Sequence, residues 1–409
     1  MKKFFMGKYK AYVWKGLNKW DQKAKGIIVA EDDAQAENET RKLGVNIDLL
    51  TYRHFLLLPN ATSKSVKIMD IVLLMRQLTT LISAGVPLVQ SLEIVSNGAE
   101  KVRLRALLLT IRDSVASGKT FSEALAPYPY FFNPLICGLI NAGEQSGTLE
   151  KMVDEIANYL ERQEYLRNRI KRAMYYPFTM LGIATIVILA MLIYLVPRFE
   201  KIYASFHAKL PAFTQKIVTF SHIIRDDWWI VLIGFFVLIY LIKTLNQKSI
   251  RFQYIRDKLA FKMIIFGSLV QKATISRICS TLAITLAAGI PLIDALNRVS
   301  RVANNLWYRD AMLHTREQVT QGESIALAMR STQLFPAMVT QMIEIGEKSG
   351  ALDQMFSKVG EYYRDQVNTA VEGLTTMIEP LLIVIIGGVV GVFVFAMYLP
   401  IFNLGLAIK

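Results

Sequence analysis

The stretch of this chain that most resembles a catalytic motif is SGKT at residues 117–120, which matches the end of a phosphate-binding loop. Three features argue against a nucleotide site there. Asp113 stands where the loop needs its first glycine, a helical run precedes the motif where a strand belongs, and the corresponding stretch 321–324 reads QGES, without the lysine. Thr120 followed by Glu123 is instead typical of a helix-capping box. We therefore expect that the chain does not itself hydrolyse ATP.

Other reactive side chains are scattered along the chain. None of the four histidines lies one helical turn from another, and no G-x-S-x-G nucleophile elbow occurs. Cys137 and Cys279 have no neighbour at a metal-site spacing and do not occupy matching places in the two halves of the chain. We expect both to be buried, reduced thiols. The sequence predicts no catalytic residue, no metal and no cofactor.

Repeated motifs are the most informative feature of the sequence. SAGVPL at residues 83–88 returns as AAGIPL at 287–292, and AGEQSG at 142–147 returns as IGEKSG at 345–350. The register holds to within about two residues. An uncharged apolar run in each copy is bracketed by prolines, which are Pro177 and Pro197 in the first and Pro380 and Pro400 in the second. A polar module that leads into a hydrophobic span has therefore been used twice.

Glycine, proline and serine in these motifs are expected to end and begin helices. Gly85 can close a helix in the left-handed conformation, and Pro87 can open the next helix where a missing N–H costs little. Ser146 and Ser349 are candidate N-caps of the helices that follow them. The turn and cap residues of the repeat are Gly85, Pro87, Gly143, Ser146 and Gly147, with Gly289, Pro291, Gly346, Ser349 and Gly350 in the second copy.

Two carboxylates are the strongest candidates for contact with a partner. Glu144 and Glu347 occupy equivalent positions after a glycine that we expect to end a helix, on loops that a helical bundle should expose. One interpretation is a solvated carboxylate beside a turn. The other is a contact point for a cytoplasmic partner, and both interpretations remain open.

Long apolar runs indicate a membrane protein. Residues 178–196 and 381–402 carry no charged side chain, and as helices they cover the roughly 30 Å hydrocarbon core of a bilayer. Residues 228–245 form a third run that spans only if Lys243 snorkels to the interface, and the alternative is a buried or interfacial helix. We predict about three transmembrane helices. Because charged groups are missing from the two long runs, a transporter or channel is the weaker hypothesis.

Lysine and arginine beside the spans predict the orientation. They place residues 1–177 and 243–379 in the cytoplasm and 198–227 outside, so the N-terminus is cytoplasmic and the C-terminus is on the opposite side. The net charge of +14 suggests nucleic acid, but the basic residues lie beside the spans and are mixed with acids. Anionic membrane lipid is therefore the expected partner, and nucleic acid is not. No signal peptide is evident.

Three residues mark where the chain should enter the membrane, namely Pro177, Glu379 and Pro380. The prolines are expected to bend long helices at the membrane surface, and Glu379 either pairs with an arginine there or serves in signalling. Gly387, Gly388 and Gly391 form a small-residue face that would let another helix approach. Packing between subunits is the preferred interpretation, with packing inside the chain or flexibility as alternatives.

The predicted fold is an all-α polytopic membrane protein with two repeated cytoplasmic helical-bundle domains and a small α/β N-terminal segment. Residues 9–14 and 26–30 read as strands and residues 34–43 as a helix. Helical periodicity begins near residue 68, with about six helices per module joined by short connections. The expected parts are an N-terminal segment (1–60), a first bundle (68–176), a span (178–196), an outer loop (198–227), a second span (228–245), a second bundle (272–379) and a third span (381–402).

These motifs together resemble the inner-membrane platform family of type IV pili and type II secretion, the type II secretion system F family. The resemblance rests on the stretches 84–88 and 142–147, on Tyr176-Pro177 before the first span, and on VPRF at 196–199 after it. It covers nearly the whole chain, including the segment around residues 9–43 and LPAF at 210–213.

The resemblance implies a protein of the bacterial inner membrane that is not an enzyme and couples a cytoplasmic motor to insertion or removal of pilin. The implied partners are hexameric pilus ATPases for extension and for retraction, pilin, other inner-membrane alignment proteins, and further copies of the chain as a homo-oligomer. The motifs are more similar to the pilus branch, and the alternative is a secretion platform that drives pseudopilus assembly. Ile345 and Lys348 depart from the first copy, so whether both modules contact the same partner remains open.

Overall fold

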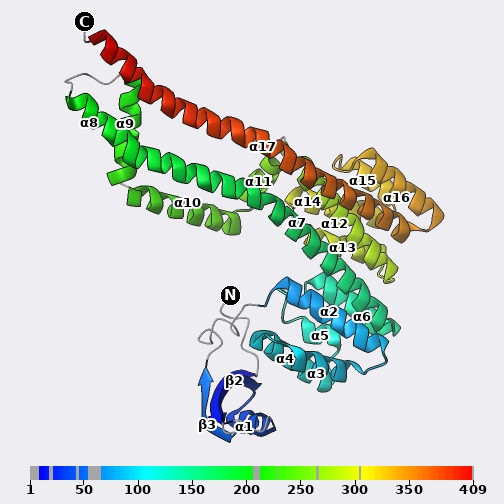
Figure 1. Ribbon diagram of the computed structural model, residues 1–409. Helices are drawn as coiled ribbons and strands as arrows, with labels where there is room; N and C mark the ends of the chain where they lie inside the picture. Colours follow the sequence, from blue (N-terminus) through cyan, green and yellow to red (C-terminus); the bar gives the residue numbers. More distant parts are fainter. Residues whose placement is uncertain are drawn as a thin grey trace. The chain divides into compact units, whose positions relative to one another are not determined.

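The computed structural model describes residues 9–17, 22–42, 46–53, 66–205, 212–226, 228–263, 267–303 and 305–407. The chain divides into two compact units. Figure 1 shows the helices and strands with the labels used below. The first comprises Met1–Leu166, Ile278–Ala303 and Ala311–Val359. The second comprises Arg167–Arg277, Asn304–Asp310 and Gly360–Lys409.

A small antiparallel sheet with one helix forms the N-terminal segment. Its strands are β1 (Lys10–Leu17), β2 (Lys23–Ala30) and β3 (Asn46–Arg53), in the order β2-β1-β3, and its helix is α1 (Asp33–Lys42). The sequence predicts two strands and the helix but misses β3. The reason is that β3, which reads NIDLLTYR, is an edge strand of mixed polarity whose pairing with β1 supplies most of its order. The linker expected at residues 59–63 lies outside the described residues.

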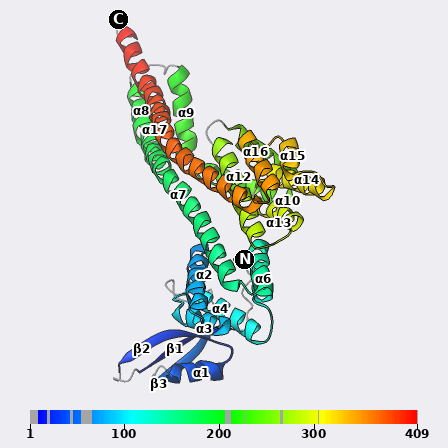
Figure 2. The ribbon, with the colours of Figure 1, turned by 90° about the vertical axis from the view of Figure 1, so that its right-hand side faces the viewer.

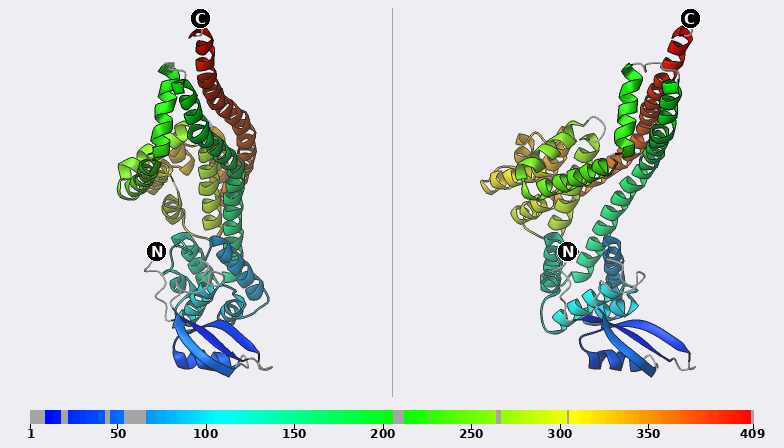
Figure 3. Two further views of the ribbon diagram at one scale, coloured as in Figure 1. Left: turned by 60° about the vertical axis from the view of Figure 1, so that its left-hand side comes forward. Right: turned by 90° about the vertical axis from the view of Figure 1, so that its left-hand side faces the viewer.

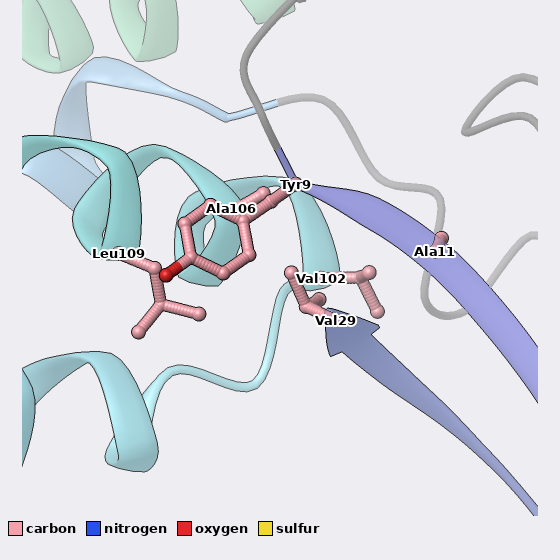
Figure 4. Close-up of a cluster of buried hydrophobic side chains, with 6 residues drawn as sticks. All are labelled: Tyr9, Ala11, Val29, Val102, Ala106 and Leu109. Carbon is pink, nitrogen blue, oxygen red and sulfur yellow. The ribbon is translucent and has the colours of Figure 1, made fainter. Parts of the chain in front are cut away.

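One face of this sheet packs on helix α4 (Val102–Ala116). Figure 4 shows the apolar cluster, which consists of Tyr9, Ala11 and Val29 from the sheet side and Val102, Ala106 and Leu109 from α4. The Tyr9 hydroxyl donates to an oxygen of Asp113 at 2.5 Å, and Arg112 pairs with the same carboxylate. Burial, together with the bond to Asp113, raises the pKa of Tyr9 well above its usual value. The N-terminal segment is therefore attached to the first bundle by both apolar and polar contacts.

The first bundle contains α2 (Ile68–Ser83), α3 (Leu88–Gly98), α4, α5 (Phe121–Leu125), α6 (Pro134–Ser146) and the start of α7 (Leu149–Ala190). Its core includes the fully buried side chains of Met75, Leu78, Leu108 and Phe121. Pro177 lies inside α7, which continues past the proline as one helix of 42 residues.

The second bundle repeats these elements in the same order. They are α12 (Gly267–Ala287), α13 (Leu292–Val302), α14 (Leu306–Thr320), α15 (Ile325–Ser331), α16 (Ala337–Ser349) and α17 (Leu352–Ala407). Left-handed glycines stand at matching turns, namely Gly85, Gly118 and Gly147 in the first copy and Gly289, Gly322 and Gly350 in the second. The repeat seen in the sequence is therefore a repeat of helices and of the turns that join them.

Two helical stretches are long and apolar enough to cross a membrane, namely 149–201 and 352–396. The most apolar part of each has a mean hydropathy of 2.5, and little of it is buried in the protein. The third predicted span corresponds to α10 (Trp228–Lys248), whose apolar stretch, Leu232–Asn246, is shorter. Large apolar side chains such as Phe235, Phe236 and Tyr240 are exposed along α10.

The segment predicted as an outer loop, 198–227, is largely helical. A π-helical turn, η2 (Met191–Leu195), follows α7 and leads into α8 (Val196–Ser205), and α9 (Ala212–Asp226) comes next. Val218 of α9 packs with Leu192, Val196 and Phe393 in an apolar cluster. Figures 2 and 3 show α9 alongside the ends of the two long helices. Residues 206–211, which include the start of the LPAF motif, lie outside the described residues.

Candidate functional site

Glu144 caps a neighbouring helix instead of standing in an exposed loop. It lies within α6, and its carboxylate accepts hydrogen bonds from the backbone N–H of Phe121 at 2.5 Å and of Ser122 at 3.1 Å. These residues open α5, where the first amides have no partner inside the helix and carry partial positive charge. The expectation of a loop fails because Gly143 does not end α6. The left-handed residue that ends it is Gly147, with a φ of 69°.

Glu347 makes the same contact in the second copy. From α16, its carboxylate accepts from the backbone N–H of Ile325 at 2.9 Å and from the hydroxyl of Ser324, at the start of α15. Both glutamates are half-buried. Neither is a freely solvated carboxylate, and contact with an outside partner stays a prediction for both.

Gly143 and Gly346 allow two helices to approach closely. A Cβ atom at Gly143 would lie 2.7 Å from Cγ of Met152, and one at Gly346 would lie 2.8 Å from Cγ of Met355. Met152 lies in α7 and Met355 in α17, the helices that continue toward the apolar spans. The glycine in each AGEQSG-type motif therefore seats the long helix against the bundle.

Ser146 and Ser349 are the last residues of α6 and α16, not N-caps of the helices that follow. Their hydroxyls donate back to the carbonyls of Ala142 and Ile345, each at 2.8 Å. The left-handed glycines come next, and the long helices begin only at Leu149 and Leu352. Each serine therefore lies in the last turn of the preceding helix, before the left-handed glycine, and not at the N-cap position of the next helix.

The SAGVPL and AAGIPL motifs also place a left-handed glycine after a helix, namely after α2 and α12. Gly85 and Gly289 have φ angles of 81° and 75°, which are favourable only for glycine. The following amide donates to a carbonyl five residues earlier, as from Val86 to Leu81 at 3.0 Å. Pro87 and Pro291 then occupy the N-cap positions of α3 and α13.

The SGKT stretch is a turn between two helices. Gly118 ends α4 with a φ of 96°, and Thr120 opens α5. The Thr120 hydroxyl accepts from the amide of Glu123 at 3.2 Å, and the Glu123 carboxylate accepts from the amide of Thr120 at 3.2 Å. The predicted capping box is confirmed. Among the described residues, no group of three His, Cys, Asp or Glu side chains could hold a metal ion.

Equivalent positions of α7 and α17 meet where the helices become apolar. The Tyr176 hydroxyl donates to a carboxylate oxygen of Glu379 at 3.3 Å, and Arg169 pairs with Glu372. Tyr176 precedes Pro177 and Glu379 precedes Pro380, so matching places in the repeat touch each other. Glu379 thus bonds to a tyrosine, where the sequence suggested an arginine. Both prolines are accommodated within continuous helix.

Two hydroxyls on α9 satisfy carbonyls that prolines leave without a partner. Pro400 has no N–H for the carbonyl of Ala396 one turn earlier, and the hydroxyl of Thr214 donates to that carbonyl at 2.8 Å. In the π-helical turn the amide of Val196 donates to the carbonyl of Met191, five residues earlier. Because Pro197 has no N–H, the Leu192 carbonyl also has no backbone donor.

Ser221 donates to that Leu192 carbonyl at 2.5 Å, and Thr214 and Ser221 are both buried. We call these two bonds the α9 clamp. Sequence reasoning missed the clamp. The signal that could have indicated it is the pair of prolines near the ends of the apolar runs, because a freed carbonyl in an apolar setting requires a donor.

Gly387, Gly388 and Gly391 lie on α17 in open surroundings. Among the described residues, no atom comes within 4 Å of a Cβ placed on any of the three, apart from the neighbours in their own helix. Packing inside the chain is therefore not seen at this face in the described part of the structure. Packing against another subunit stays a prediction.

A duplicated helical bundle, with each copy continuing into a helix long and apolar enough to cross a bilayer, defines a membrane protein built by repetition. The family model described as Type II secretion system (T2SS), protein F, matches residues 74–197 and 278–400. The chain belongs to this family. Each matched region begins inside the first helix of a bundle. The two regions end at Pro197 and Pro400, which have no N–H for the Leu192 and Ala396 carbonyls that accept the bonds of the α9 clamp.

The chain is similar along most of its length to curated proteins of the pilus and secretion systems. It is 40% identical over 365 residues to the type IV pilus assembly protein PilC of Pseudomonas aeruginosa, covering 89% of this chain and 97% of that protein. It is 41% identical over 395 residues to the type IV pilus assembly protein TapC of Aeromonas hydrophila, covering 97% and 95%. It is 30% identical over 345 residues to the type II secretion system protein F of Vibrio cholerae, covering 84% of each.

Proposed function

We propose that this chain is the inner-membrane platform of a type IV pilus machine, which couples a cytoplasmic hexameric ATPase to insertion or removal of pilin. The names of the relatives at 40% and 41% identity support the pilus assignment. The alternative is a type II secretion platform that drives pseudopilus assembly, and the relative from Vibrio cholerae supports it at lower identity.

The observation that best supports a role in coupling is the continuity of α7 and α17. Each begins inside a bundle and runs into an apolar stretch as one helix, of 42 and 56 residues. Gly143 and Gly346 seat the start of each helix closely against its bundle. Because an α-helix is stiff over this length, a force on a bundle would reach the membrane segment without being absorbed in a loop.

In this proposal the bundles at 68–176 and 272–379 lie in the cytoplasm, where extension and retraction ATPases act on them. Segment 198–227 and the C-terminus face the periplasm. The spans contact pilin, the inner-membrane alignment proteins and a second copy of the chain. α10 is the third span, which its exposed apolar side chains support, since a helix that is apolar all round needs an apolar solvent.

Deletion of the gene, with complementation, tests the function. The expected result is loss of surface pili with unchanged release of secreted proteins, measured by electron microscopy and by protein content of the medium. Loss of secretion with intact pili would favour the alternative. If both remain intact while the protein is normally produced, the proposal is wrong.

A further inference from the structure

Helix α11 (Ile250–Lys262) follows α10 and has two different faces. Its inner face contacts residues 305–310. Asp257 is buried, and its carboxylate accepts from the backbone N–H of Leu306 at 2.9 Å. Tyr254 bonds to Asp310 from the same side.

The outer face of α11 is apolar and basic. Ile255 is 65% exposed and Leu259 is 63% exposed, and they lie one helical turn apart on the same face of α11. Arg251, Arg256 and Lys258 are exposed beside them. Lys258 also lies over the ring of Trp307, and Arg256 pairs with Asp257. Since Asp257 is the only acid in α11 and points inward, the outer face carries no negative charge.

The corner between α10 and α11 is fixed by hydrogen bonds. Gln253 donates to the backbone carbonyl of Asn246 at 2.6 Å, and Arg256 donates to the side-chain oxygen of Asn246 at 2.6 Å. Ser249 caps the start of α11 by accepting from the amide of Phe252. The outer face of α11 therefore has a set direction relative to the apolar helix that precedes it.

We propose that this outer face of α11 lies on the cytoplasmic surface of a bilayer containing anionic phospholipid, with Ile255 and Leu259 inserted at the interface. The inference rests on the proposed location of α10 in the membrane. An apolar stripe flanked by basic side chains matches an anionic lipid surface in both hydrophobicity and charge. The contact would hold residues 305–310, which bond to α11, near the membrane surface.

Depth-dependent quenching in the full-length protein tests this surface. In a background with Cys137→Ser and Cys279→Ala, single cysteines replace Ile255 or Leu259 and carry an environment-sensitive fluorophore. The protein is placed in vesicles of phosphatidylcholine alone or mixed with phosphatidylglycerol, with nitroxide-labelled lipid as quencher. Labels at both positions should shift to the blue and be quenched, more so with phosphatidylglycerol. Arg251→Gln should reduce that lipid dependence.

Two matched controls carry exposed apolar residues elsewhere on the bundles. Leu327→Cys on α15 and Ile345→Cys on α16, which are 54% and 56% exposed before substitution, should report water in every vesicle. A label at Val237→Cys, in α10, tests the proposed third span separately. The proposal is overturned if labels at 255 and 259 match those controls while the label at 237 is quenched.

The proposal would also be overturned if the labels at 255 and 259 become less exposed to water as the protein-to-lipid ratio rises, with no effect of lipid charge. A second copy of the chain would then cover the face. An unquenched label at 237 would contradict the third span and would remove the membrane location on which this inference rests.

Discussion

At the residue scale, Glu144 and Glu347 explain why both copies keep the sequence Gly-Glu-x-Ser-Gly. The glutamate caps a short helix, the glycine before it admits a methionine from the long helix, the serine bonds one turn back, and the final glycine reverses the chain. Each residue of the motif thus has a structural task inside its own bundle. Any contact with an ATPase would be an additional task for the same carboxylates.

Removing the Glu144 carboxylate should destabilise the first bundle. Glu144→Ala leaves two amides of α5 without an acceptor, and the expected cost is about 1–2 kcal/mol. Gln145→Ala, on the exposed neighbour, should change stability by less than about 0.5 kcal/mol. Thermal unfolding of the detergent-solubilised protein, followed by tryptophan fluorescence, measures both.

Reversing the charge of both glutamates tests for a partner contact. Glu144→Lys with Glu347→Lys should weaken ATPase association in a pull-down if the carboxylates meet the motor. Unchanged pull-down and piliation in this double variant would exclude both residues as partner contacts.

At the element scale, α9 connects the two long apolar helices. Thr214 and Ser221 each donate to a backbone carbonyl that a proline has left without a partner, one in α17 and one in the π-helical turn after α7. The segment expected to be a periplasmic loop is therefore a structural part of the membrane unit. Its two hydroxyls hold the ends of the two spans in one arrangement.

A double-mutant cycle tests the clamp. Thr214→Val keeps the side-chain shape but leaves the Ala396 carbonyl buried without a donor, which should cost about 1–3 kcal/mol. In a Pro400→Ala background the restored N–H can reach that carbonyl, so the same substitution should cost much less. Thr219→Val, whose hydroxyl bonds only within its own helix, is the control. Equal losses in both backgrounds, measured by thermal unfolding, would contradict the clamp.

At the scale of the whole molecule, the long helices of the two repeats meet at matching positions where they become apolar. Tyr176 with Glu379 and Arg169 with Glu372 join α7 and α17 there. A movement of one long helix would therefore be transmitted to the other. In the proposed platform, these contacts would let the two long helices move together.

Interrupting helix continuity should uncouple the machine without unfolding it. Lys171 and Arg172 are exposed on α7 before Pro177, and changing both to glycine lowers the helix preference by about 1 kcal/mol at each position. We expect normal amounts of protein in the membrane but few pili. Lys171→Ala with Arg172→Ala removes the same side chains and keeps the helix, so it should retain pili. Wild-type piliation of the glycine variant would show that stiffness at this point is not required.

Sequence alone determined the duplication, most of the helices, the left-handed glycine turns and the two long apolar stretches. These features depend on short-range effects, namely the periodicity of apolar side chains and the backbone freedom of glycine, which are visible within a few residues. The capping box at Thr120 could also be predicted from the sequence, because both of its partners lie in one turn.

Only the tertiary structure determined which atoms the side chains of the motifs contact. Glu144 meets an amide 23 residues away, and Thr214 meets a carbonyl 182 residues away, so no local pattern names these partners. The third strand and the Tyr176–Glu379 bond depend on the same kind of long-range pairing. Prolines and glutamates show from sequence that a partner is needed, and only the packed chain determines which atom supplies it.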